Sequence, residues 1–114
     1  MNICSWTLEL RKDHTFTSTD YQYDISGASI INECKTVYSG TFGASEDGKS
    51  FAFHATSKRY QKNTTTVNEH AEATLEFLKG GCLAIRVPRF VGHVMTGAVP
   101  SWLKDEYPTI PWPT

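Results

Sequence analysis

The sequence lacks the features that mark several large functional classes. Its 114 residues carry 11 basic and 12 acidic side chains, so there is no basic excess of the kind that nucleic-acid-binding domains usually show. No apolar run reaches the length of a membrane span, and the first residues show neither the basic start nor the apolar stretch of a secretory signal. We therefore expect a cytoplasmic protein with no nucleic-acid partner and no membrane partner.

Cysteine is scarce, and its spacing excludes the common short metal motifs. Cys4, Cys34 and Cys82 are too far apart in sequence to form a Cys-x-x-Cys pair. The chain also lacks a nucleophilic serine motif, a phosphate-binding glycine loop and a His-Glu-x-x-His helix. We expect three free thiols, no metal site and no cofactor, in one domain, since the length fits one domain and not two.

The strongest positive signal is the alternation of polar and apolar residues that is typical of half-buried β-strands. It recurs along the chain in residues 4–11, 15–23, 35–43, 50–60 and 82–87. Asp47-Gly48 separates two of these runs, and glycine supplies the positive φ that a tight hairpin turn needs. The pattern predicts an all-β domain of short antiparallel strands.

Residues 66–79 fit two different structures. As a helix, they would begin with the capping box Thr66-Val67-Asn68-Glu69 and end at a glycine. As a strand, residues 71–77 alternate, and Lys79-Gly80-Gly81 becomes the turn into the next strand. Local propensity favours the helix, whereas the short turn and the β-rich surroundings favour the strand. We expect at most one helix longer than two turns, and only in this segment.

The end of the chain has a different composition. We assign residues 1–100 to a β-barrel domain and residues 101–114 to a C-terminal tail in which Ser101–Glu106 can form one helical turn. The prolines of residues 108–113 are incompatible with a helix or an inner strand. Trp102 and Trp112 favour docking of this tail, either over the mouth of the barrel or on a partner protein.

Two stretches resemble lipocalin-like small β-barrel domains. Trp6-Thr7-Leu8-Glu9-Leu10, followed by Asp13-His14-Thr15-Phe16, is similar to their opening hairpin, with His14 where glycine is usual. Tyr38-Ser39-Gly40-Thr41-Phe42, followed by Asp47-Gly48-Lys49-Ser50-Phe51, is similar to a later strand and hairpin. The resemblance covers about half of the chain. It implies a small antiparallel up-and-down β-barrel around a small apolar molecule, which some relatives cyclise, isomerise or decarboxylate, and it carries over no catalytic residue.

Candidate catalytic residues are polar groups within apolar strands. Arg86 lies between Ile85 and Val87, and His93 lies in the apolar run 90–95. If these strands pair, both side chains lie at about the same level, where Arg86 would hold a ligand oxygen and His93 would transfer a proton. The strict alternation around Arg86 is the opposing observation, because buried neighbours would turn it outward.

Further candidates come from other predicted strands. His54 lies mid-strand, opposite two phenylalanines, and is a third candidate for acid–base catalysis if its face lines the cavity rather than the solvent. Tyr21, Tyr23 and Tyr38 are candidate ligand-binding residues because they can stack on a ligand or donate to its oxygens. Trp6 is a fourth candidate ligand contact, or else a plug at the barrel end.

These residues predict binding of a small apolar or aromatic molecule in a barrel cavity. If the protein is an enzyme, we expect a cyclase, isomerase or lyase that needs no cofactor. Two alternatives stay open. One is a non-enzymatic protein-interaction module that uses a sheet edge or the tail. The other is the subunit of a homodimer without a cavity.

Overall fold

The computed structural model describes residues 2–88, 91–96 and 99–113, with residues 81 and 91–96 described by their backbone only. The described elements run in the following order along the chain: β1 (Asn2–Leu10), β2 (Thr15–Ser26), β3 (Ser29–Ala44), β4 (Phe51–Tyr60), β5 (Asn63–Glu72), β6 (Thr74–Phe77), a 3-10 turn (Lys79–Gly81), β7 (Leu83–Val87), β8 (Val91–Thr96) and α1 (Ser101–Glu106).

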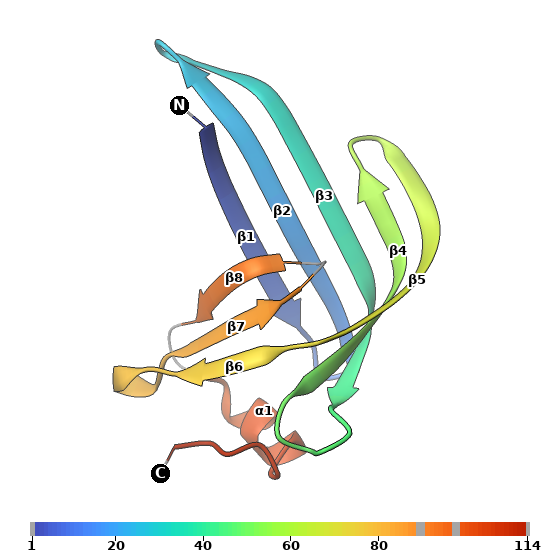
Figure 1. The fold of residues 1–114 in the computed structure, drawn as a ribbon, viewed down its shortest axis with the longest axis vertical. Coiled ribbons are helices and arrows are strands. Elements are labelled where there is room, and N and C mark those ends of the chain that lie inside the picture. Colours follow the sequence, from blue (N-terminus) through green and yellow to red (C-terminus); the bar gives the residue numbers. More distant parts are fainter. Residues whose placement is uncertain (1, 89–90, 97–98, 114) are drawn as a thin grey trace.

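The strands form two antiparallel sheets, drawn in Figure 1. β1 to β5 pair in sequence order as a five-stranded meander, and β6, β7 and β8 pair as a smaller sheet. The three-stranded sheet lies across one end of the long strands, and β1 to β3 extend well beyond it. The prediction of an antiparallel β fold with one short helix is confirmed. In the described ranges the paired strands make these two sheets, and no closed barrel is found.

One continuous stretch of chain belongs to both sheets. β5 ends at Glu72 and β6 begins at Thr74, so only Ala73 separates them. Ala73 is buried, and its amide donates to the carbonyl oxygen of Phe51 at 2.9 Å, which extends the pairing with β4 up to the junction. Of the two structures that residues 66–79 fit, the strand is therefore confirmed. Backbone pairing with β4 and β7 outweighs the local helix propensity of the segment.

The core lies between the sheets, on what we call the inner face of the five-stranded sheet. This face carries Phe16, Phe42, Phe51 and Phe53, each at most 5% exposed. The smaller sheet, α1 and the tail cover them with Leu83, Ile85, Val87, Leu103, Tyr107 and Ile110. The rings of Phe16 and Phe53 meet edge to face, with centroids 5.0 Å apart. Burial of each phenylalanine contributes about 1.5–3 kcal/mol to folding, so this cluster is the main source of stability.

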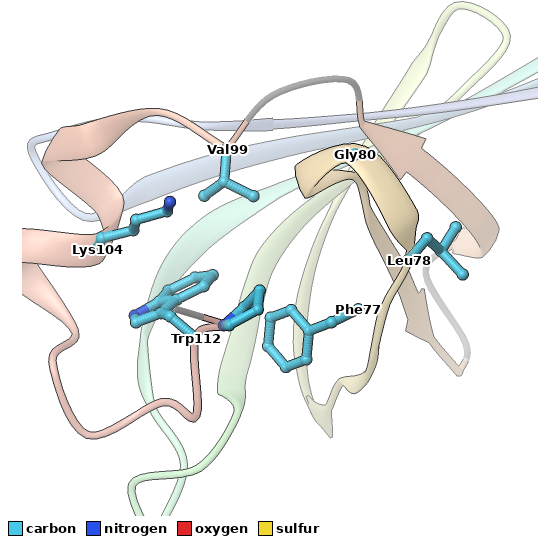
Figure 2. A pocket seen from close by; sticks show the side chains of 7 residues that line it. Phe77, Leu78, Gly80, Val99, Lys104 and Trp112 are labelled. Carbon is cyan, nitrogen blue, oxygen red and sulfur yellow. The ribbon is translucent and has the colours of Figure 1, made fainter.

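The C-terminal tail folds onto the body of the domain. Ile110 is 2% exposed, and the Trp112 indole Nε1 donates to the Tyr107 carbonyl oxygen at 2.9 Å. The Trp112 ring lies beside the Phe77 ring, with centroids 5.7 Å apart (Figure 2). Thr109 adds a hydrogen bond from its hydroxyl to the Gly48 carbonyl at 2.6 Å. The tail thereby closes one end of the core.

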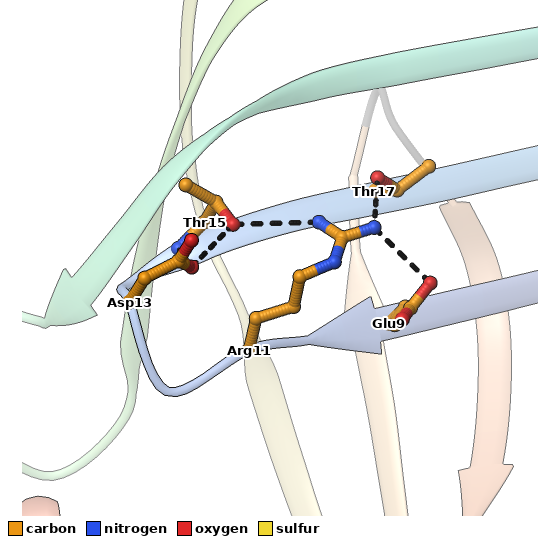
Figure 3. Close-up of polar contacts among 5 residues, drawn as sticks. All are labelled: Glu9, Arg11, Asp13, Thr15 and Thr17. Atoms are coloured by element: carbon orange, nitrogen blue, oxygen red, sulfur yellow. Dashed lines mark hydrogen bonds and ion pairs between the residues drawn. The ribbon is translucent and has the colours of Figure 1, made fainter.

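Polar side chains fix the turn between β1 and β2 (Figure 3). The Arg11 guanidinium lies 3.1 Å from a Glu9 carboxylate oxygen and donates to the Thr17 hydroxyl at 2.7 Å. Hydrogen bonds from the Thr15 side chain and backbone hold the pKa of Asp13 below its ordinary value. His14 has φ 69°, the left-handed conformation that glycine usually adopts at such a position.

A β-bulge changes the face on which the end of β4 presents its side chains. The β3–β4 register shifts between Ser39 and Gly40, which leaves Thr56 of β4 without an opposite residue. Beyond the shift, Lys58 pairs with Tyr38 and so lies on the inner face. The alternation predicted for residues 50–60, if it ran without interruption, places Lys58 on the face opposite the phenylalanines of β4. That prediction is wrong because of the bulge.

Two remaining expectations concern cysteines and membrane segments. Cys4, Cys34 and Cys82 are all free thiols, as predicted. Among the described residues, no helix combines the length and the apolar character that a bilayer-spanning segment requires.

Candidate functional site

Two of the predicted catalytic residues, Arg86 on β7 and His54 on β4, lie in different sheets. Arg86 is exposed, whereas Ile85 and Val87 are 2% and 1% exposed. The inward orientation predicted for Arg86 is therefore wrong, because β7 keeps its strict two-residue alternation at this position. His93 lies in β8, and its side chain falls outside the described residues.

His54 lies on the outer face of the five-stranded sheet, opposite the core. Its Nε2 atom is 2.7 Å from Oδ1 of Asn68. Its ring stacks on that of His70, its direct partner on β5, with centroids 4.1 Å apart and ring planes at 10°. The sequence showed both histidines but not their pairing, since the bulged register of β4 and β5 decides which residues are opposite. His54 thus contacts polar side chains rather than the core.

The predicted ligand-binding residues divide between the two faces of the sheet. Tyr21 and Tyr23 lie on the outer face with ring centroids 5.2 Å apart, and a hydrogen bond with Glu33 raises the pKa of Tyr21. Tyr38 lies on the inner face because it pairs with the buried Ser18, and Trp6 lies on the inner face of β1. Tyr38 therefore cannot line the same cavity as Tyr21 and Tyr23. Trp6 and Tyr38 share the inner face, and Tyr21 and Tyr23 share the outer face.

A pocket with a volume of about 300 Å³ lies between the end of β6 and the C-terminal tail (Figure 2). We call it the tail pocket. Most of its lining is aromatic or aliphatic, and one residue is charged. Its lining residues are Phe77, Leu78, Gly80, Val99, Lys104, Trp112 and Pro113.

The apolar walls of the tail pocket are held by contacts within the fold. Phe77 ends β6 and is half-buried, and its ring meets the Trp112 ring at close to a right angle (72°). Trp112 is held in turn by the hydrogen bond from its indole nitrogen to Tyr107, whose side chain is in the core. Because Tyr107 is anchored, this wall is formed before a ligand arrives.

Lys104 supplies the cation of the tail pocket. It lies on α1, and Figure 2 shows its side chain extending over the pocket toward Val99 and Trp112. Within the described ranges, the ion pairs join Glu9 to Arg11 and His14 to Glu106, and neither involves Lys104. A lysine ammonium on a flexible stem suits a carboxylate, sulfonate or phosphate oxygen as a point charge.

The sequence did not predict this pocket. Trp112 was predicted only to pack against the body of the domain or against a partner, because a tryptophan in a proline-rich segment exposes apolar surface unless it packs on another surface. The sequence pattern did not single out Phe77 or Lys104, since only the tertiary structure brings the end of β6 and α1 to the same pocket. In the part of the chain that the structure describes, no cluster of three or more metal-ligating side chains is found.

Comparisons of the chain with protein-family models, with curated proteins and with solved structures found no match.

Proposed function

We propose that this protein binds a small apolar or aromatic molecule with an anionic group, and that the molecule occupies the tail pocket. The observation that carries the proposal is the lining of the pocket, in which aromatic and aliphatic walls meet a single ammonium group. Ligand sites in proteins have this composition: mostly apolar, with a few polar groups that fix orientation. The proposal keeps one part of the lipocalin-like prediction, the binding of a small apolar molecule, and places that molecule between the end of β6 and the C-terminal tail.

The size of the tail pocket limits the ligand. Its volume of about 300 Å³ is at the lower end of the range of small-molecule sites, which limits the ligand to about three aromatic rings. Burial of its apolar surface would supply about 25 cal/mol per Å². Neither Arg86 nor His54 lines this pocket, so the proposal is limited to binding.

Anilinonaphthalene sulfonate tests the proposal, because it joins apolar rings to one anionic group. Titration of the full chain should give a saturable rise in dye fluorescence with one site per chain. Lys104→Met should weaken binding by about twofold to fivefold, the effect expected for the loss of one solvent-exposed charge–charge contact. Trp112→Leu should weaken it as well. Lys62→Met, in the distant turn between β4 and β5, is the matched control and should bind as the unmodified chain does.

A neutral dye separates the contribution of charge to the affinity from the contribution of ring packing. N-phenylnaphthylamine has the rings without the sulfonate, so Lys104→Met should leave its affinity unchanged and Trp112→Leu should lower it. Equal affinities of all three variants for both dyes would rule out the tail pocket as the site. Dye binding that appears only with dimer formation in sedimentation would instead support the homodimer alternative.

A further inference from the structure

A row of side chains crosses the inner face where the smaller sheet does not cover it. Trp6 of β1 pairs with Asp20 of β2, Asp20 with Thr36 of β3, and Thr36 with Tyr60 of β4. Paired residues in a sheet point to the same face, so these four side chains form one line across four strands. Neighbouring strands lie about 4.8 Å apart, which places the two ends of the row three strand spacings, about 14 Å, from each other.

Both ends of the row are exposed aromatic side chains. Trp6 is 37% exposed and Tyr60 is 49% exposed, although both lie on the face that elsewhere forms the core. Asp20 and Thr36 between them are half-buried and polar. A line with aromatic ends and a hydrogen-bonding centre differs from the apolar packing of Phe16, Phe42 and Phe53 further along the same face.

The adjoining rows add more hydrogen-bonding groups. On one side, the Gln22 amide donates to an Asp20 carboxylate oxygen at 3.2 Å. On the other, the Lys58 ammonium lies 5.5 Å from the centre of the Tyr38 ring. The Ser18 hydroxyl and one Glu69 carboxylate oxygen are buried on this face without a hydrogen-bond partner among the described residues. Because both of these groups are buried, the polar groups in the adjoining rows that a ligand can reach are the partly exposed side chains of Gln22 and Lys58.

We propose that the open part of the inner face binds a neutral oligosaccharide. A pyranose ring presents an apolar C–H face that packs on an aromatic ring, and its hydroxyls exchange hydrogen bonds with carboxylate, amide, hydroxyl and ammonium groups. Trp6 and Tyr60 supply the two platforms, and Asp20, with Gln22 beside it, supplies the polar contacts between them. This site is separate from the tail pocket and does not depend on its ligand.

Charge favours a sugar over a single-stranded nucleic acid, which also stacks on aromatic platforms. The centre of the row is the carboxylate of Asp20, which repels a phosphate backbone. The chain as a whole has a net charge of −1. A neutral ligand rich in hydroxyls meets no such repulsion. Its hydroxyls can form hydrogen bonds with both the carboxylate and the ammonium groups on the face.

Calorimetric titration of the full chain with neutral hexasaccharides of glucose, xylose, mannose and N-acetylglucosamine tests the proposal. We expect saturable binding of at least one of them. Trp6→Ala and Tyr60→Ala should each weaken it by about threefold to tenfold or more, through loss of a stacked ring. Tyr23→Ala, on the outer face, is the matched control and should have no effect. Lys104→Met should leave sugar binding intact, which separates this site from the tail pocket.

Three results would overturn the oligosaccharide site. The first is the absence of binding to every sugar of the panel at millimolar concentration. The second is an equal effect of Trp6→Ala, Tyr60→Ala and Tyr23→Ala on the affinity. The third is tighter binding of oligothymidylate than of any sugar. Melting temperatures of the variants confirm that each is folded, and the exposed Tyr60 provides the readout if Trp6→Ala destabilises the chain.

Discussion

Two buried serines, Ser45 and Ser18, differ in whether their hydroxyl groups have hydrogen-bond partners. The Ser45 hydroxyl donates to Oδ1 of Asp47 at 2.6 Å and accepts from the Ser50 amide at 3.1 Å, which fixes the turn between β3 and β4. Ser18 is fully buried in the middle of β2, and its hydroxyl has no hydrogen-bond partner in the described part of the chain. A buried hydroxyl without a partner loses its hydration and gains nothing in return.

Replacing each serine by alanine should therefore have opposite consequences. Ser45→Ala should lower the free energy of unfolding by about 1–2 kcal/mol, because it removes two hydrogen bonds from a turn. Ser18→Ala should leave it unchanged or raise it by up to about 1 kcal/mol, since only an unpaired polar group is lost. Urea denaturation measures both. A loss at Ser18 as large as that at Ser45 would mean that a bound water or ligand pairs with the Ser18 hydroxyl.

At the scale of elements, the pairing of β3 with β4 depends on a close backbone approach. Gly40 lies at the register shift between these strands, where a Cβ atom would collide with the His54 carbonyl oxygen and lie 2.9 Å from the Ala55 Cα. Both obstacles are backbone atoms, which cannot move aside as a flexible side chain does. Gly43, later on the same strand, has no atom within 4 Å of the corresponding position.

These two glycines provide a matched pair of substitutions. Gly40→Ala should destabilise the protein by about 2–3 kcal/mol, because the strands must separate or change register. Gly43→Ala should be neutral or stabilise by up to about 1 kcal/mol, since alanine restricts the unfolded chain without a clash. Thermal unfolding followed by circular dichroism distinguishes them. Similar melting temperatures for the two variants would contradict the close approach at the bulge.

The elements themselves were largely predictable from the sequence, because alternation and turn residues are local signals. Residues 50–60 show a structural feature that these local signals do not predict. Their first half follows the predicted faces, but the bulge at Thr56 reverses the faces of Lys58 and Tyr60. An extra residue in one strand leaves no trace in polarity when both neighbouring positions are polar. Sequence analysis therefore missed the Trp6–Tyr60 row, which depends on three successive registers.

At the scale of the whole molecule, the C-terminal tail is part of the core. Ile110 is 2% exposed although it lies between prolines, in a segment whose composition alone is typical of an extended linker. Strand alternation also did not reveal that the strands divide into two sheets. That division depends on where β5 leaves β4, and only the buried Ala73 and its backbone contact with Phe51 mark the place.

Substitutions in the tail should show that it contributes to stability. Ile110→Ala should lower the free energy of unfolding by about 2–4 kcal/mol, the usual cost of truncating a fully buried aliphatic side chain. Pro111→Ala, at the exposed neighbouring position, is the control and should change it by no more than about 0.5 kcal/mol. Chemical denaturation of the full chain measures both values. Equal stability of the two variants would mean that the tail only rests on the surface.

The strand that passes from β5 into β6 has a consequence for local opening of the molecule. Its first half is held by β4 and its second half by β7, so we expect the amides of the two sheets to exchange together at this junction. We expect local opening instead at parts that extend beyond both sheets' shared core, such as the far end of the β2–β3 hairpin. A single chain segment thus makes the core respond to denaturation as a whole.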